Sequence, residues 1–144
     1  MSQPHYYEVK ADWKNGRKGL LSSPVLNETI ECATPPEFPK GEPGIWSPEH
    51  LFAAAISSCY LSTFLAIAEN FKLDFQSFSC NTICKLELVE GKFQISEAEI
   101  TPVLVLADPE NDREKALKVL EKSKAACLVT NSMKTAVTLK NPFN

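Results

Sequence analysis

The sequence lacks several patterns by which common classes of protein are recognised. It has no C-x-x-C pair and only two histidines, so a zinc site of the usual kind is not expected. It has no glycine-rich phosphate loop and no G-x-S-x-G elbow, which argues against the nucleotide and hydrolase chemistry that these motifs serve. It also has no internal repeat and no low-complexity tract. A net charge of −3 argues against a nucleic-acid-binding surface.

Length and cysteine content set the expected domain number and compartment. The 144 residues suit one ordinary domain with a real core, so we expect residues 1–144 to form a single domain. Residues 1–13 are polar and alternating rather than basic and then apolar, which is not the pattern of a secretory signal. Five cysteines without an export signal indicate free thiols in a reducing compartment. We therefore expect a cytoplasmic protein.

One stretch, residues 44–70, is apolar enough to organise the rest of the chain. The serine-proline pair that begins at Ser47 is a strong helix start, because serine caps the first N–H groups and proline needs no partner at the first position. Glu49 follows in the first turn, where the helix dipole favours a carboxylate. From His50 to Ala68 no residue carries a formal charge when histidine is neutral. A helix without a charged face is expected to be buried, and Cys59 lies in its middle.

The same run raises the question of a membrane span, because about eighteen apolar residues is the usual threshold. Small residues in it favour close helix packing, and several hydroxyl groups interrupt it. The hydroxyl groups belong to Ser57, Ser58, Tyr60, Ser62 and Thr63. The rest of the chain offers no further hydrophobic span. We therefore expect a core helix and no membrane partner.

The segments on either side of this helix indicate an α+β fold. Three strands, a hairpin turn at Asn15-Gly16 and a proline-rich connector are expected before it, with the strands at 5–13, 20–23 and 27–33 and the connector at 34–44. Further strands and two helices are expected after it, at 73–89, 92–107 (one long or two short strands), 108–126, 127–134 and 135–139. Alternation within 73–89 places the even-numbered residues from Cys80 to Leu88 on one face. The order β-β-β, α, β-β-β, α-α, β is an α+β pattern.

Two of the five cysteines stand apart by position. Cys59 lies in a hydroxyl-rich patch of the long helix, and Cys127 lies where one helix ends and another begins, a place that favours the thiolate. Both are also explained as small buried hydrophobic residues, and the two interpretations remain open on composition. Cys80 and Cys84 share a strand face about 13 Å apart at roughly 3.3 Å per residue. That separation is too large for a disulfide or a shared metal ion, and Cys32 has no evident partner.

Three segments form a recognisable set of motifs. The first is G-R-K-G-L-L-S, which begins a residue before Arg17. The second is S-P-E-H-L-F-A-A-A-I-S-S-C, in which Cys59 follows Glu49 by ten residues. The third is C-L-V-T-N-S, which begins at Cys127. Together they resemble the OsmC/Ohr family of osmotically inducible and organic hydroperoxide resistance proteins over nearly the whole chain. The resemblance implies an OsmC-like fold, with antiparallel sheets packed around a long buried central helix in an intertwined homodimer.

The resemblance implies a cysteine-based peroxidase for organic hydroperoxides that acts in peroxide stress defence. Cys59 would be the peroxidatic thiolate, and Cys127 would resolve its sulfenic acid to a disulfide. Arg17 would contact both sulfur and peroxide, and Glu49 would hold Arg17 through a bidentate ion pair. A dithiol reductant, of lipoyl type in the family, would reset the pair, with no bound cofactor and no metal. Taken singly, Arg17 reads as a solvated turn residue and Glu49 as an ordinary first-turn acid.

The spacing of Glu49 and Cys59 bears on the assembly. Ten residues along one straight helix correspond to about 15 Å of rise and turn the two side chains roughly 80° out of line. Within one chain Glu49 therefore cannot lie beside Cys59. If Arg17 touches both, the simplest arrangement is a two-fold dimer in which Glu49 of one subunit lies near Cys59 of the other. We expect an obligate homodimer with two shared sites.

The chain also departs from the family pattern. Leu128 stands where a proline commonly follows the second cysteine, the preceding K-S-K-A-A lacks a histidine seen in many members, and the connector lacks the usual glycine cluster. The subfamily, the physiological peroxide and the aromatic residues of the pocket are not defined by these motifs. The rival hypothesis is a non-catalytic dimeric protein that binds a small hydrophobic ligand beside Cys59 or senses redox state. A disulfide between Cys59 and Cys127 on oxidation would separate the two.

Overall fold

The computed structural model describes residues 3–143, which form two compact units that divide between Leu51 and Phe52. The first unit contains a small sheet and a connector. The second contains a second sheet and most of the helical residues. The expectation of a single domain over residues 1–144 stays a prediction.

The first unit is built on a three-stranded antiparallel sheet in the order β1-β2-β3. The strands are β1 (Lys10–Asn15), β2 (Lys18–Ser22) and β3 (Ile30–Ala33). The predicted turn at Asn15-Gly16 is confirmed, and Gly16 has a φ of +52° that glycine adopts readily. The predicted start of the first strand at residue 5 is wrong. Because Lys10 pairs with Ser22 at the end of β2, the residues before it have no strand to pair with.

The proline-rich connector is irregular, as predicted, and is held by its own backbone. Phe38 N–H donates to Pro35 O at 3.1 Å, and Glu42 N–H donates to Thr34 O at 2.9 Å. A Cβ atom at Gly41 would lie 1.9 Å from Pro35 O, so only glycine fits this crossing of the loop on itself.

The predicted long helix is confirmed as α1 (Pro48–Asn70). Its cap is also confirmed, because the buried Ser47 Oγ accepts from the backbone N–H of His50 at 3.1 Å. The buried side chains of α1 recur every four residues, at Ile56, Tyr60, Phe64 and Ala68. The opposite side retains Leu61 and Leu65, which are 39% and 46% exposed. Burial all round, which the apolar sequence predicts, is therefore not reached within one chain.

By length and composition alone, α1 is also the one helix within residues 3–143 that could cross a membrane. The core helix of a globular protein meets the same criterion. One side of α1 packs into the apolar core of the second unit, and 22% of the most apolar stretch of α1 is buried.

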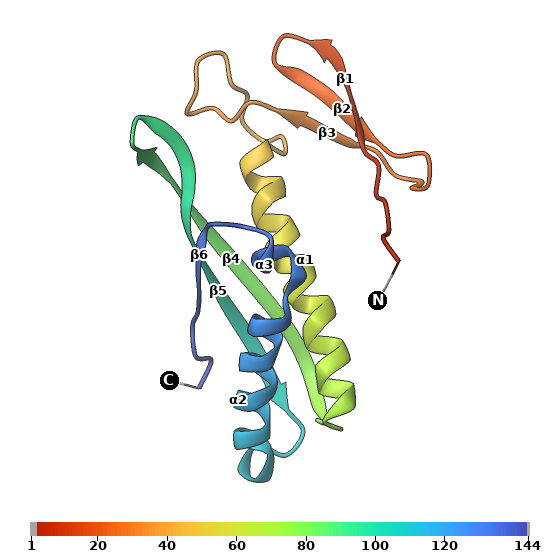
Figure 1. The fold of residues 1–144 in the computed structure, drawn as a ribbon, viewed down its shortest axis with the longest axis vertical. Coiled ribbons are helices and arrows are strands. Elements are labelled where there is room, and N and C mark those ends of the chain that lie inside the picture. Colours follow the sequence, from red (N-terminus) through yellow and green to blue (C-terminus); the bar gives the residue numbers. More distant parts are fainter. Residues whose placement is uncertain (1–2, 144) are drawn as a thin grey trace. The chain divides into compact units, whose positions relative to one another are not determined.

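The second unit contains a three-stranded sheet in the order β4-β5-β6 (Figure 1). The strands are β4 (Phe75–Val89), β5 (Lys92–Leu106) and β6 (Ala136–Leu139). The first two form a long antiparallel hairpin, which settles the choice between one and two strands after residue 92 in favour of one. β6 runs parallel to β5. The sheet is therefore mixed, because the chain returns to it through helices rather than through a hairpin.

The predicted alternation along β4 holds only as far as Cys84. At the next step β5 contributes an additional residue, Ser96, between the partners of Lys85 and Leu86, which is a β-bulge. Beyond it Leu86 and Leu88 are exposed, whereas the sequence places them on the same face as Cys84. The hydroxyl of Ser96 donates to the carboxylate of Glu87 at this point. A bulge on one strand cannot be read from the alternation of its partner.

The returning helices are α2 (Pro109–Ala126) and α3 (Leu128–Asn131), as predicted in number and place. Asp108 caps α2 by accepting from Asn111 N–H. Residues of α1, α2, β4 and β5 form one apolar core. In that core the rings of Phe64 and Phe78 stack with centroids 3.9 Å apart, and the hydroxyl of Tyr60 donates to Leu120 O at 2.9 Å. This core fixes α1 against the end of α2.

Candidate functional site

The two cysteines singled out by the motifs meet in the second unit. Cys59 lies on α1 and is half-buried, and Cys127 is fully buried between α2 and α3. Their side chains lie within hydrogen-bonding reach of each other. The core contacts between α1 and α2 place one thiol on each side of the same small space. Neighbouring thiols are the arrangement that a disulfide would require.

The chain break at Cys127 supplies polar groups to this space. Cys127 has an extended conformation, with φ −66° and ψ 108°, which ends α2 and lets α3 begin directly after it. The first N–H groups of a helix have no partner within the helix. Here the backbone N–H groups of Val129 and Leu128 act as hydrogen-bond donors that lower the pKa of Cys59. The thiol therefore faces the positive end of a short helix together with a neighbouring thiol.

These groups set the ionisation of Cys59. Burial alone would raise its pKa, because it disfavours the thiolate. The N–H of Val129, the thiol of Cys127, the hydroxyl of Thr63 and the N–H of Leu128 outweigh burial, and the pKa of Cys59 is lowered. Thr63 Oγ1 lies 4.0 Å from the sulfur, one helical turn further along α1. Cys59 is therefore the more acidic thiol of the pair.

Cys127 is shifted in the opposite direction. Burial is the largest cause and raises its pKa, and the neighbouring Cys59 adds to the increase, although bonds from Thr130 oppose it. The thiolate therefore forms more readily on Cys59 than on Cys127. A thiolate is the form that attacks an electrophile, and a protonated neighbour can donate to it.

The remaining cysteines lie apart from this arrangement. Cys80 donates to Ser57 O at 3.4 Å, and burial raises the pKa of Cys80 and of Cys84. Cys32 lies on β3 in the first unit and forms a β-bridge with Trp46. All five cysteines are free thiols. Among residues 3–143, no group of three or more histidine, cysteine or acidic side chains is placed to hold a metal ion.

Arg17 lies in the hairpin between β1 and β2 and is exposed. It lines a surface pocket of about 410 Å³ in the first unit, whose other lining residues include Asp12, Trp13, Lys18 and Cys32. The indole N–H of Trp13 donates to Gly16 O at 3.0 Å, which ties the indole to the residue before Arg17. The pocket therefore combines charged side chains of both signs with an exposed indole.

Glu49 lies in the first turn of α1, and its Oε1 atom is buried without a hydrogen-bond partner. A buried carboxylate oxygen left in this state is costly, so it normally has a cationic partner. Arg17 forms no ion pair with Glu49 or with any other carboxylate in the part of the chain that the structure describes. Both groups predicted to bind each other are therefore unpaired within one chain.

The motifs do not identify every group around Cys59. Thr63 follows it by four residues, a spacing that puts the two side chains on the same face of a helix, so this contact is readable from the sequence. The N–H groups of Leu128 and Val129 carry no side-chain signal. These N–H groups affect the pKa of Cys59 only because the backbone turns at Cys127 and α3 begins there.

The fold and the thiol pair define an α+β protein with a two-cysteine site. The model of the OsmC-like protein family matches residues 41–141, and the chain belongs to this family. The resemblance seen in the motifs is thereby confirmed. The chain is 21% identical over 138 residues to the uncharacterized protein YmaD of Bacillus subtilis (strain 168), with 94% of this chain and 91% of that protein covered.

Solved structures of OsmC-like proteins share the fold. An OsmC-like protein of unknown function from Vibrio cholerae is 22% identical, with a TM-score of 0.81 and coverage of 94% of this chain and 99% of that chain. An organic hydroperoxide resistance protein from Elizabethkingia anophelis is also 22% identical, with a TM-score of 0.75 and coverage of 96% and 99%. At these identities the likeness establishes the fold, and the predicted OsmC-like fold is confirmed.

Proposed function

We propose that the protein is a thiol-dependent peroxidase that reduces organic hydroperoxides through Cys59 and Cys127. The observation that carries the proposal is that two neighbouring thiols have pKa values shifted in opposite directions. The pKa of Cys59 is lowered by N–H groups of α3 and by the Cys127 thiol, and burial raises the pKa of Cys127. Family membership and the names of several structural neighbours, organic hydroperoxide resistance proteins, point to the same chemistry.

The proposed reaction has three balanced steps. The thiolate of Cys59 attacks the distal oxygen of the hydroperoxide, the O–O bond breaks, and the alkoxide takes a proton and leaves as the alcohol. The thiol of Cys127 then attacks the sulfenic acid of Cys59, which forms the disulfide and releases water. An external dithiol, of lipoyl type, reduces this disulfide by thiol–disulfide exchange and becomes oxidised itself. No bound cofactor enters the cycle.

Arg17 and Glu49 would complete the site across a homodimer. Among residues 3–143 of one chain, Glu49 Oε1 is buried without a hydrogen-bond partner, and the exposed Arg17 forms no ion pair. In a dimer with shared sites, an Arg17–Glu49 pair would lie beside Cys59 of the partner subunit, where the guanidinium favours the thiolate and binds the peroxide. The uncovered side of α1, with Leu61 and Leu65, gives such a dimer an apolar surface to bury.

The pocket around Arg17 also bears on the substrate. Its lining contains charged side chains (Asp12, Arg17 and Lys18) and apolar ones (Trp13, two alanines and Pro48), and the apolar groups would contact the organic part of a hydroperoxide. Free thiols in all five cysteines fit a reducing compartment, and a cytoplasmic location is part of the proposal.

The experiment is turnover of cumene hydroperoxide and of hydrogen peroxide with dihydrolipoamide as the reductant. We expect rapid turnover of the organic peroxide, weaker turnover of hydrogen peroxide and loss of both in Cys59→Ser. Cys127→Ser should still consume one equivalent of peroxide but should not cycle. Cys84→Ser is the matched control, because Cys84 lies on β4 outside the pair, and it should retain wild-type turnover.

The rival hypothesis predicts a different result. A non-catalytic ligand-binding protein would give no turnover although its thiols are intact and titratable. It would also form no Cys59–Cys127 disulfide after stoichiometric peroxide, which peptide mapping by mass spectrometry would establish. If turnover or the disulfide is absent, the similarity to the family would extend to the fold and not to the peroxidase activity.

A further inference from the structure

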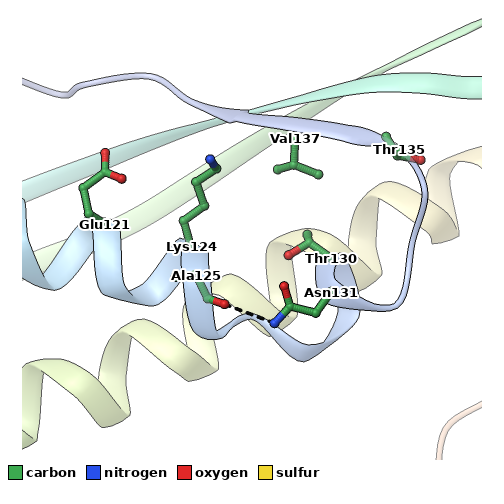
Figure 2. A pocket seen from close by; sticks show the side chains of 7 residues that line it. All are labelled: Glu121, Lys124, Ala125, Thr130, Asn131, Thr135 and Val137. Atoms are coloured by element: carbon green, nitrogen blue, oxygen red, sulfur yellow. Dashed lines mark hydrogen bonds between the residues drawn. The ribbon is translucent and has the colours of Figure 1, made fainter.

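A second pocket is lined by residues next to the turn that carries Cys127, and neither the motifs nor the proposed chemistry uses it. It is a surface pocket of about 240 Å³ between the end of α2, α3 and β6 (Figure 2). Its lining consists of Glu121, Lys124, Ala125, Thr130, Asn131, Thr135 and Val137. Figure 2 shows Glu121 and Lys124 pointing from α2 towards the strand that carries Val137. Two opposite charges therefore face one small space.

The two charges are free to bind a ligand. In the chain from residue 3 to 143, neither Glu121 nor Lys124 forms an ion pair, although they stand one helical turn apart. Side chains at this spacing have Cβ atoms about 5–6 Å apart. An ammonium and a carboxylate attached to the same carbon atom of one molecule can bridge such a gap. A dianion would be repelled by Glu121, and a simple amine would be repelled by Lys124.

The rest of the polar lining offers acceptors. The hydroxyl of Thr130 donates to Cys127 O at 3.1 Å, and that of Thr135 donates to Ile95 O at 2.8 Å. The amide nitrogen of Asn131 donates to Ala125 O at 3.1 Å, which leaves its carbonyl oxygen available (Figure 2). Both hydroxyl protons and one of the two amide protons of Asn131 are used, so the wall offers more acceptors than donors and suits a ligand group that donates hydrogen bonds.

We infer that this pocket binds a small α-amino acid whose side chain ends in a hydrogen-bond donor. Its carboxylate pairs with Lys124, its ammonium pairs with Glu121, and its donor reaches Asn131 and the two threonines. Glutamine, with a terminal amide, has this chemistry and is small enough for the volume.

The pocket shares its walls with the residues that hold Cys127. Thr130 Oγ1 and the N–H of Asn131 both donate to Cys127 O, the latter at 3.0 Å. A ligand that spans α2, α3 and β6 therefore stabilises the closed turn in which Cys127 is buried. A bound amino acid would lower the rate at which Cys127 becomes accessible. The consequence for peroxide reduction rests on the proposed function, whereas the binding and the protection of Cys127 do not.

The test is calorimetric titration of the full chain with L-glutamine and two matched compounds. Glutaramate lacks the ammonium, and 4-aminobutanamide lacks the carboxylate. We expect a dissociation constant for glutamine of about 1 mM, as suits a ligand of this size, and binding of either matched compound about tenfold weaker. Glu121→Gln and Lys124→Gln should weaken glutamine binding similarly. Glu114→Gln and Lys118→Gln, on the same helix outside the pocket, should leave it unchanged.

The second readout is alkylation of the buried Cys127 by N-ethylmaleimide in Cys59→Ser, followed by mass spectrometry. Glutamine at ten times its dissociation constant should slow the modification by about elevenfold if it binds only the closed turn. No heat of binding up to about 10 mM glutamine, or equal binding of the matched compounds, would overturn the site. Binding without protection of Cys127 would overturn the coupling. A wild type without peroxidase turnover would count against the proposed function and leave both readouts intact.

Discussion

At the scale of single residues, Cys59 differs from Cys80, Cys84 and Cys127 in the direction in which its pKa is shifted. Burial raises the pKa of the other three, whereas the bonds from α3, Cys127 and Thr63 overcome burial at Cys59. A half-buried thiol becomes acidic because backbone N–H groups and a neighbouring thiol stabilise its charge, without a cation in the same unit. Chemical selectivity among the cysteines therefore arises from the backbone around α3.

The first prediction concerns the pH dependence of thiol alkylation by iodoacetamide. Only the thiolate reacts, so each rate falls as pH drops through that thiol's own pKa. An ordinary thiol has a pKa near 8.5. As the pH is lowered, Cys84, whose pKa is raised, should be the first to lose its alkylation rate. Cys59, whose pKa is lowered, should be alkylated at its full alkaline rate until the pH falls below that of an ordinary thiol. Peptide-resolved mass spectrometry gives both profiles from one sample. Coincident profiles for the two residues would contradict the assignment.

The second prediction concerns Leu128, where the family commonly has proline. The N–H of Leu128 is one of the donors to Cys59, and proline has none. Leu128→Pro should therefore raise the pKa of Cys59 and slow its alkylation at pH 7 by roughly two- to tenfold, which corresponds to one hydrogen bond of about 0.5–1.5 kcal/mol. Proline suits the first position of a helix, and the extended ψ of 108° at Cys127 is compatible with a following proline.

Leu128→Ala is the matched control for this substitution. It removes the same exposed side chain and keeps the N–H group, so the reactivity of Cys59 should be unchanged. An equal loss in both variants would assign the effect to the leucine side chain and refute the role of its backbone.

At the scale of elements, the tie between α1 and α2 places Cys59 beside Cys127. The hydroxyl of Tyr60, the residue after Cys59, donates to Leu120 O at 2.9 Å in the core. Tyr60→Phe should lower the free energy of unfolding at pH 7 by about 1 kcal/mol, since Leu120 O keeps its partner within α2. Urea unfolding measures this change. Tyr6→Phe, at a residue that is 89% exposed, should leave stability unchanged.

The stability difference between wild type and Tyr60→Phe should itself depend on pH. Burial raises the pKa of Tyr60, so its contribution is complete below the pKa of the unfolded phenol, about 10, and is lost as pH rises further. The two proteins should therefore approach each other in stability above about pH 10. A difference that stays constant to high pH would show that Tyr60 is not kept neutral by the fold.

The elements also show what the sequence could predict. The cap at Ser47, the absence of charge to Ala68 and the strand signal of residues 73–89 are local patterns, and α1 and β4 follow from them. The bulge at Ser96 and the parallel pairing of β6 depend on the partner strand, so no local pattern carries them. The same distinction applies to the site. Cys59 and Cys127 are visible as motifs, whereas the N–H groups that tune Cys59 appear only with the backbone of α3.

At the scale of the whole molecule, one chain leaves several groups unsatisfied. Within residues 3–143, Leu61 and Leu65 on α1 are exposed, Arg17 forms no ion pair, and Glu49 Oε1 is buried without a partner. The exposed leucines and the buried carboxylate oxygen are unfavourable states that a symmetric partner could relieve, and the hydrated guanidinium of Arg17 is free to pair. A dimer with shared sites accounts for all of them together, and it gives a sharp genetic test, because each site would draw its thiol and its arginine from different subunits.

That test is complementation between two inactive variants, Cys59→Ser and Arg17→Ala, co-expressed with different tags and purified as the mixed dimer. In a shared-site dimer, Cys59 of the Arg17→Ala chain meets Arg17 of the Cys59→Ser chain, so one site is intact and the other carries both defects. The mixed dimer should therefore recover about half of the wild-type turnover of cumene hydroperoxide, while each homodimer stays inactive. Sites contained within single chains would each keep one defect, and the mixed dimer would then be as inactive as its parents. Glu49→Gln paired with Cys59→Ser should behave like Arg17→Ala, because Glu49 is proposed to hold the arginine at the same shared site.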